Sequence, residues 1–313
     1  FRNSLRNGKG VFEFANGGKY TGEFLDDKYE GDGKLVQANG DIYEGHYREG
    51  ERDGRGKFTF ANGNWFEGTF RNGKYVRGTF VFANGNRYEG DFKNSLRDGR
   101  GVFTFANGDR YEGDFVEDKF VGSGCFTYKN GDSYTGTYKN GERSGHGVFK
   151  FANGNVYDGE FVNGSFYGRG SFKFSNGNSY IGQFVASKRC GYGIFRFNDG
   201  SSFEGQFKDD CYHGHGTLTC SNKDRFVGDF VNNKKEGVFH VYPVRGTAHV
   251  SFFRNDSEVF NVGTFPEIAG SSVADVSLAF PGTEKFDEFK QVFGEHQNGQ
   301  IECFSKHKPK PIV

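Results

Sequence analysis

Much of the chain consists of short stretches in which hydrophobic and polar positions alternate. Residues 87–109, RYEGDFKNSLRDGRGVFTFANGD, open with Tyr88, Gly90 and Phe92, and acidic residues stand between them. Successive side chains of a β-strand point to opposite faces. The alternation therefore predicts a strand with rings on one face and carboxylates on the other.

The rest of this unit predicts a second strand and a tight turn. The polar residues 94–99 indicate a loop, after which Gly101, Phe103 and Phe105 alternate again. Asn107-Gly108 favours a type I′ hairpin turn, in which both central residues have φ > 0. The unit is thus predicted to be two antiparallel strands, and its turn leads directly into the next unit at Arg110.

The same unit recurs along most of the chain, at an interval of about 23 residues, which is typical of repeat architectures. The opening aromatic residue is followed by glycine two positions later and by Phe or Tyr two positions after that. The ten opening residues are Tyr20, Tyr43, Phe66, Tyr88, Tyr111, Tyr134, Tyr157, Tyr180, Phe203 and Phe226. The interval from Phe66 to Tyr88 is one residue shorter than the others, which predicts a tightened loop between Phe70 and Gly78.

The glycines and rings of each unit are expected to pack together. A glycine between two aromatic residues leaves a notch that a neighbouring ring can fill, at an entropic cost of roughly 0.5–1 kcal/mol. Offset ring contacts contribute roughly 0.5–1.5 kcal/mol each beyond area burial. Each unit of such an array contacts only its neighbours, so the rings are core first and a binding platform second.

The combination of YxGxF, a Gly-x-Gly pair and an NG turn in each successive unit resembles the MORN (membrane occupation and recognition nexus) repeat family. The resemblance covers roughly residues 1–242. It implies an all-β fold, namely an elongated, twisted, single-layer antiparallel β-sheet in which the aromatics of one repeat pack over the glycines of the next. It also implies a non-enzymatic scaffold or protein-interaction module, with self-association through terminal repeats as a further family property.

The repeat pattern predicts two regions. Residues 1–242 form the array, a partial first unit followed by ten further units, so we expect the chain to begin inside a repeat. Residues 243–313 contain no repeat and are interpreted as a C-terminal cap or as an interaction segment. Alternation at residues 248–252 and 274–280 predicts strands there. The spacing of Phe286, Phe289 and Phe293 predicts a short helix over residues 284–293.

Composition narrows the function classes. The chain has 50 glycines and 18% aromatic residues, which argues against an ordinary globular domain. Lys and Arg number 40, as do Asp and Glu, so no overall charge steers the molecule towards nucleic acid. No apolar run is long enough for a transmembrane helix. The five cysteines, odd in number and irregularly spaced, fit free thiols in a reducing compartment.

No catalytic motif and no cofactor-binding motif is found, so neither enzymatic activity nor a cofactor is expected. We interpret the chain as a cytoplasmic scaffold of a cytoskeletal or ciliary (axonemal) assembly, a setting that the family resemblance implies, and its partners as proteins. An amphipathic partner helix lying on the aromatic rows would contact the rings of the central units. These rings are Tyr88, Phe92, Tyr111, Phe115, Tyr134, Tyr138, Tyr157 and Phe161.

Two other readings remain open. Basic residues recur at matching loop positions and predict a positive edge. This edge either binds anionic lipid such as phosphoinositides or is simply solvated. The edge comprises Arg52, Arg55, Arg97, Arg100, Lys119, Arg143 and Arg169. The chain also fits the regulatory repeat region of a larger enzyme.

One cluster of soft ligands occurs in consecutive units. Cysteine and histidine side chains suit zinc, and the four that fall in equivalent loops are Cys190, Cys211, His213 and His215. Against zinc, the Gly-His-Gly loop also occurs around His146 and looks like ordinary repeat sequence. We therefore expect no metal site and retain these four residues only as an alternative.

Overall fold

The computed structural model describes residues 5–264. Every element of regular secondary structure in this range is a β-strand, which confirms the all-β class. The chain divides into two compact units, residues 1–188 and 189–313. Sixteen strands lie in the first unit: β1 (Gly8–Glu13), β2 (Lys19–Leu25), β3 (Lys28–Val36), β4 (Ile42–Arg48), β5 (Glu51–Thr59), β6 (Trp65–Arg71), β7 (Lys74–Val81), β8 (Arg87–Lys93), β9 (Leu96–Thr104), β10 (Arg110–Val116), β11 (Lys119–Thr127), β12 (Ser133–Lys139), β13 (Glu142–Lys150), β14 (Val156–Val162), β15 (Ser165–Lys173) and β16 (Ser179–Val185). The strands that follow are β17 (Lys188–Arg196), β18 (Ser202–Lys208), β19 (Cys211–Thr219), β20 (Arg225–Val231), β21 (Lys234–Tyr242), β22 (His249–Arg254) and β23 (Ser257–Thr264).

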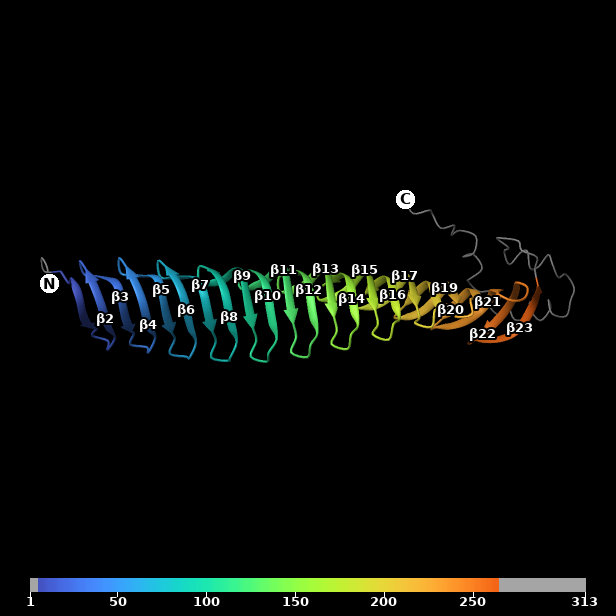
Figure 1. The fold of residues 1–313 in the computed structure, drawn as a ribbon, viewed down its shortest axis with the longest axis horizontal. Coiled ribbons are helices and arrows are strands. Elements are labelled where there is room, and N and C mark those ends of the chain that lie inside the picture. Colours follow the sequence, from blue (N-terminus) through green and yellow to red (C-terminus); the bar gives the residue numbers. More distant parts are fainter. Residues whose placement is uncertain (1–4, 265–313) are drawn as a thin grey trace, which may run out of the picture. The chain divides into compact units, whose positions relative to one another are not determined.

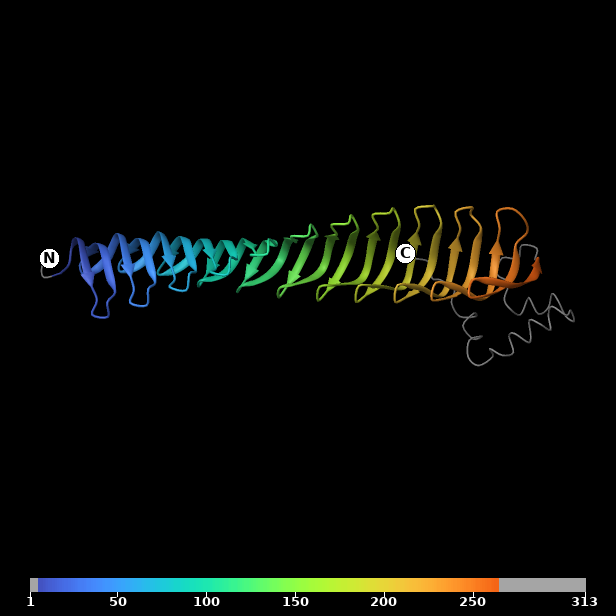
Figure 2. The ribbon, with the colours of Figure 1, turned by 90° about the horizontal axis from the view of Figure 1, so that it is seen from below.

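The first unit is a single-layer antiparallel sheet, as predicted. From β1 to β16, every two consecutive strands pair with each other. Figure 1 shows these strands side by side, and Figure 2 shows that they twist along the array. Since no second layer covers the sheet among residues 5–264, each strand must bury its rings against its own neighbours.

The turn predicted at Asn107-Gly108 has a different geometry. Only Gly108 has a positive φ, 97°, and its N–H donates to Phe105 O at 2.9 Å. Phe105 N–H in turn donates to Asp109 O at 2.9 Å. These bonds close a three-residue loop that ends in one left-handed glycine. The type I′ prediction for this dipeptide was therefore wrong.

The two-residue turns lie at the opposite edge of the sheet. Asn94 and Ser95, with φ of 52° and 64°, alone connect β8 to β9. The loop predicted at residues 94–99 was thus wrong for residues 96–99, which belong to β9. Both faces of a single-layer sheet meet solvent, so polar residues there do not mark a loop. In the shorter unit the missing residue likewise comes from strand β7, which has eight residues, and not from the turn.

A ladder of glycines runs through the middle of the first unit. Gly113 lies opposite Gly101 on β9 and opposite Gly124 on β11, and the same pairing recurs along the array. The ring of Tyr111 covers this glycine pair: a Cβ added at Gly124 would lie 2.5 Å from its Oη. The Oη donates to Asp114 O at 3.1 Å. Rings therefore pack over glycines of their own repeat, which corrects the expectation that they cover those of the next.

Adjacent repeats meet through ring edges. Tyr111 packs edge-to-face on Tyr138 of the following unit, with centroids 5.1 Å apart. The same contact joins Tyr88 to Phe115 at 5.0 Å. Because an edge-to-face pair aligns the positive rim of one ring with the negative face of the other, each repeat is attracted to its neighbour.

The second unit continues the same kind of pairing beyond the repeats. β21 pairs with β22, and β22 with β23, both antiparallel. The strand predicted at residues 248–252 is thus found as β22, and Phe253 packs edge-to-face on Phe239 at 5.3 Å. The predicted strand at 274–280 and helix at 284–293 lie outside the described residues.

Candidate interaction groove

The eight rings proposed as partner contacts are buried in the chain itself. Tyr88, Tyr111, Tyr134 and Tyr157 are fully covered, and the most exposed of the eight, Phe92, shows only 9% of its surface. The others are Phe115, Phe161 and Tyr138. A contact through these rings stays a prediction, but the surface that they offer to a partner is small.

Arginine and aromatic residues alternate at one position of successive repeats. In one repeat, the Arg97 guanidinium lies 4.9 Å from the centroid of Phe103, and the side chain is 20% exposed. In the next repeat, Phe120 occupies that position and stacks on Tyr111 with centroids 3.8 Å apart. The alternating residues of the first unit are Arg6, Tyr29, Arg52, Tyr75, Arg97, Phe120, Arg143 and Phe166. The structural period is therefore two repeats, a period also visible in the sequence as an arginine at this position of every second repeat.

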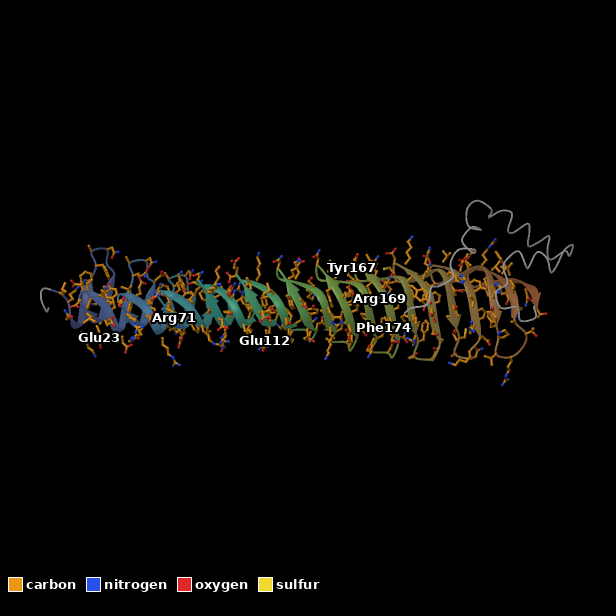
Figure 3. All side chains as sticks on the ribbon, turned by 90° about the horizontal axis from the view of Figure 1, so that it is seen from above. Glu23, Arg71, Glu112, Tyr167, Arg169 and Phe174 are labelled. Atoms are coloured by element: carbon orange, nitrogen blue, oxygen red, sulfur yellow. The ribbon has the colours of Figure 1, made fainter. Side chains whose placement is uncertain are left out.

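The seven basic residues proposed as one positive edge lie on both faces of the sheet. Arg52, Arg97 and Arg143 stack over aromatic rings on the ring face. The strand alternation places Lys119, Arg55, Arg100 and Arg169 on the opposite face, where Figure 3 labels Arg169. Anionic-lipid binding stays a prediction, and a flat membrane would meet only one of these two sets.

The four proposed zinc ligands do not form a site. Cys190 lies on β17 and the other three on β19, and β18 is hydrogen-bonded between these strands. Strands two apart in a sheet are separated by roughly 10 Å, too far for one ion. Within residues 5–264 no group of three or more His, Cys, Asp or Glu side chains could hold a metal. Instead, His215 Nδ1 lies 3.1 Å from Asp229 Oδ1.

A groove opens on the face opposite the rings. It has a volume of about 990 Å³ over β2 to β7, and backbone of Gly33, Gly45, Gly56 and Gly68 lines it. Its walls carry ion pairs between neighbouring strands: Lys34 Nζ lies 3.2 Å from Glu44 Oε2, and Lys57 Nζ lies 3.6 Å from Glu67 Oε2. A smaller hollow of about 310 Å³ continues on this face towards β10, where Figure 3 labels Glu112.

One rim of the groove is apolar except for the hydroxyl of Thr59. Val36, Ile42, Thr59, Trp65 and Val81 lie opposite one another in register on five successive strands, and we call them the apolar row. Further along the first unit, charged residues such as Arg87, Arg110 and Lys150 occupy this row. Sequence reasoning missed the apolar row, although the only tryptophan of the chain marks it.

One cation of the groove has no acidic partner. Arg55 lies opposite Thr69, whereas the next arginine in the same row, Arg77, lies opposite Asp91 with Nη1 and Oδ1 2.9 Å apart. The Arg55 side chain is exposed and forms no ion pair within the described part of the chain. The groove therefore combines ion-paired walls, a largely apolar rim and one guanidinium that forms no ion pair with the described residues.

An open, single-layer repeat sheet with such a groove defines a repeat-built interaction module. A protein-family model described as MORN repeat matches eleven consecutive segments, residues 1–19, 20–42, 43–65, 66–87, 88–110, 111–133, 134–156, 157–179, 180–202, 203–225 and 226–238. The chain belongs to this family. MORN repeats are a non-enzymatic repeat module that generally mediates protein or membrane interactions. Among residues 5–264, no helix is long and apolar enough to span a bilayer.

Comparison with other proteins adds little to this assignment. No curated protein matches the chain. Among solved structures, it is similar to the TCP domain of Drosophila melanogaster SAS-4 in complex with a proline-rich motif of Ana2, at 10% identity and a TM-score of 0.34, covering 56% of this chain and 90% of that one. It is also similar to a streptogramin B lyase, at 10% identity and a TM-score of 0.15, covering 73% and 92%. Scores this low carry no argument about partners or activity.

Proposed function

We propose that this chain is a scaffold that binds a partner protein along the groove opposite its rings, over several repeats. The observation that carries the proposal is the groove of about 990 Å³ over β2 to β7. On the ring face, the aromatic side chains are buried against the sheet itself, as the fully buried Tyr88 and Tyr111 show. The groove face, in contrast, leaves charged and apolar side chains accessible.

Two features support a protein as the occupant. The groove walls alternate in charge, as in the pairs Lys34–Glu44 and Lys57–Glu67, and favour neither sign strongly. A partner segment can exchange such exposed pairs for its own at small cost, because each contributes only about 0–1 kcal/mol. Membership of the MORN family supports a cytoskeletal or ciliary setting in the cytoplasm.

Cross-linking in the native complex tests the proposal. The full chain is purified from its source together with its partners and treated with a lysine-reactive cross-linker. Cross-links to the partner are expected at Lys34 and Lys57, which flank the groove, and not at Lys93, which adjoins the turn at the end of β8. Recovery of no stoichiometric protein, or cross-links confined to the turn edges, would contradict it.

The sequence also suggested membrane binding and other roles, and membrane binding has a separate test. Co-sedimentation with phosphoinositide-containing liposomes, lost at high salt, would indicate membrane binding instead. Self-association through terminal repeats, capping by residues 243–313 and a regulatory role in a larger enzyme stay predictions.

A further inference from the structure

We infer that the groove over β3 to β7 takes an extended segment of a partner protein that carries both a carboxylate and an apolar side chain. This inference rests on the proposed function and specifies the chemistry of its partner. Arg55 is the anchor for the carboxylate, and the apolar row is the docking surface for the apolar side chain.

The charge of the groove selects an acidic group. Its other cations are already paired: Lys34 with Glu44, Lys57 with Glu67, and Arg77 with Asp91. The remaining carboxylate of the lining, Asp32, lies 3.3 Å from the imidazole of His46. Arg55 lies opposite Thr69 on β6, is exposed and forms no ion pair within residues 5–264. A guanidinium presents a planar fork of donors that fits a carboxylate with two parallel hydrogen bonds. An incoming carboxylate would thus meet the one guanidinium that has no competing acid.

The apolar row supplies the second contact. Ile42, Thr59 and Trp65 stand opposite one another on β4, β5 and β6, and Ile42 and Thr59 line the groove. The Trp65 ring is half-buried and lies 4.7 Å from Lys57 Nζ. Tryptophan and arginine are the residue types most often found at the energetic centres of interfaces. Their presence in one groove marks β4 to β6 as the centre of recognition.

The distance between the two contacts predicts the spacing in the partner. Thr59 of the apolar row and Arg55 are four residues apart on β5. Four residues of extended chain span roughly 13 Å, and residues four apart point to the same face. A segment running along β5 would therefore reach both with an apolar residue and an acidic residue four positions apart.

A second arginine provides a matched control. Arg169 occupies the same position of a later repeat, lies opposite Gln183 and has no ion pair in the described range. In the row beside it, Lys173 lies between Val156 and Ser179, so Val156 is the one apolar residue of these three. Arg169 thus keeps the unpaired cation but lacks the tryptophan and the isoleucine of the apolar row.

Peptide selection on the full chain tests the inference. A phage-displayed library of random peptides of about a dozen residues is panned on the immobilised protein. Enriched peptides are synthesised, and their binding is followed by anisotropy of a fluorescein label and by the emission of Trp65, the only tryptophan. The expected consensus contains Asp or Glu together with a large apolar residue, and binding is expected to shift Trp65 emission.

Three variants assign the site. R55Q and T69D are each expected to weaken the peptides about tenfold, the equivalent of one charge-assisted hydrogen bond. T69D keeps the arginine but offers it an internal acid, as Asp91 does for Arg77. R169Q is expected to leave the affinity within about twofold. Circular dichroism of each variant checks that the sheet is intact.

The contrary outcomes are distinct. Basic or purely apolar peptides, or binding that R55Q and T69D leave unchanged, would overturn this inference and leave the proposed function standing. Enrichment of no peptide at all would contradict both. A Trp65 response to phosphatidylserine vesicles without any peptide binding would overturn both in favour of a membrane surface.

Discussion

Arg97, at the start of β9, and Asp118, in the turn of the following repeat, are joined at three points. The backbone N–H of Arg97 donates to Asp118 Oδ1 at 3.0 Å, its Nε to the same oxygen at 2.8 Å, and its Nη2 to Asp118 O at 3.2 Å. The same guanidinium lies over the ring of Phe103. This arginine therefore connects strand, turn and core of two repeats, which the exposed arginines of the groove face do not.

Replacing Arg97 by glutamine should destabilise the array. The change removes a charge-assisted pair and a cation–π contact, and we expect a loss of about 1–3 kcal/mol in the free energy of unfolding, measured by urea denaturation. Arg100→Gln is the control, because that side chain is 79% exposed and 3.8 Å from its acid. Its cost should stay below about 1 kcal/mol. Equal costs for both variants would refute the structural role of Arg97.

A methyl group in the glycine ladder should cost more. In Gly113→Ala the new Cβ would lie 2.5 Å from Tyr111 Oη and 2.7 Å from Gly124 Cα, so ring and backbone must move. Overpacking of this kind costs about 1–3 kcal/mol. Hydrogen exchange should show the loss locally in β10 and β11, since repeats contact only their neighbours. Ser123→Ala, at an exposed position of β11, serves as the control. Unchanged amide protection of β10 and β11 in Gly113→Ala would contradict the packing.

Ala186→Gly should stabilise the first unit. Ala186 has φ 48° in a two-residue turn, where a Cβ costs roughly 1 kcal/mol. Thermal denaturation should therefore show a higher midpoint. Ala152→Gly, at a turn residue without positive φ, should have the opposite sign because glycine only adds freedom to the unfolded chain. Destabilisation by both substitutions would argue against the left-handed conformation at Ala186.

Alkaline pH should unfold the array through its tyrosines. Burial raises the pKa of Tyr20, Tyr43 and Tyr134 to about 12. The unfolded chain releases these protons near pH 10, where the folded chain still holds them, so stability is complete below about pH 10 and falls as pH rises towards 12. Phenolate absorbance and circular dichroism should change together in this window.

Tyr134→Phe provides the matched test of this linkage. Phe66 and Phe203 already occupy the equivalent position in other repeats, so the ring position accepts phenylalanine. The variant loses the hydrogen bond from Oη to Thr137 O, but it should lose less stability than the native chain between pH 10 and 12. Full phenolate formation at pH 10 with the sheet intact would contradict the burial argument.

The repeat pattern alone predicted the class of fold and much of its register. The ring face contains Tyr88, Gly90 and Phe92 because strand side chains alternate. Since the repeat length is nearly constant, the equivalent residues of every hairpin lie on the same face. The same pattern misplaced the turns. Asn107-Gly108 has the residues of a type I′ turn, but Phe105 donates a hydrogen bond to Asp109 O and accepts one from Gly108 N–H, which closes a longer loop. The less typical pair Asn94-Ser95 takes the left-handed geometry.

The sequence by itself determined the strands, the ring face and the membership of a repeat family, because these depend on local alternation and on a unit that occurs ten times in the chain. Only the tertiary structure decided which side chains remain available. Arg97 and Arg55 both belong to the recurring basic positions of the sequence, yet one is fixed on Asp118 and the other lies unpaired opposite Thr69. Whether a side chain is available to a partner depends on the residue that lies opposite it on the neighbouring strand. That residue is close in sequence, but register and bulges determine which one it is, and the repeat motif itself does not.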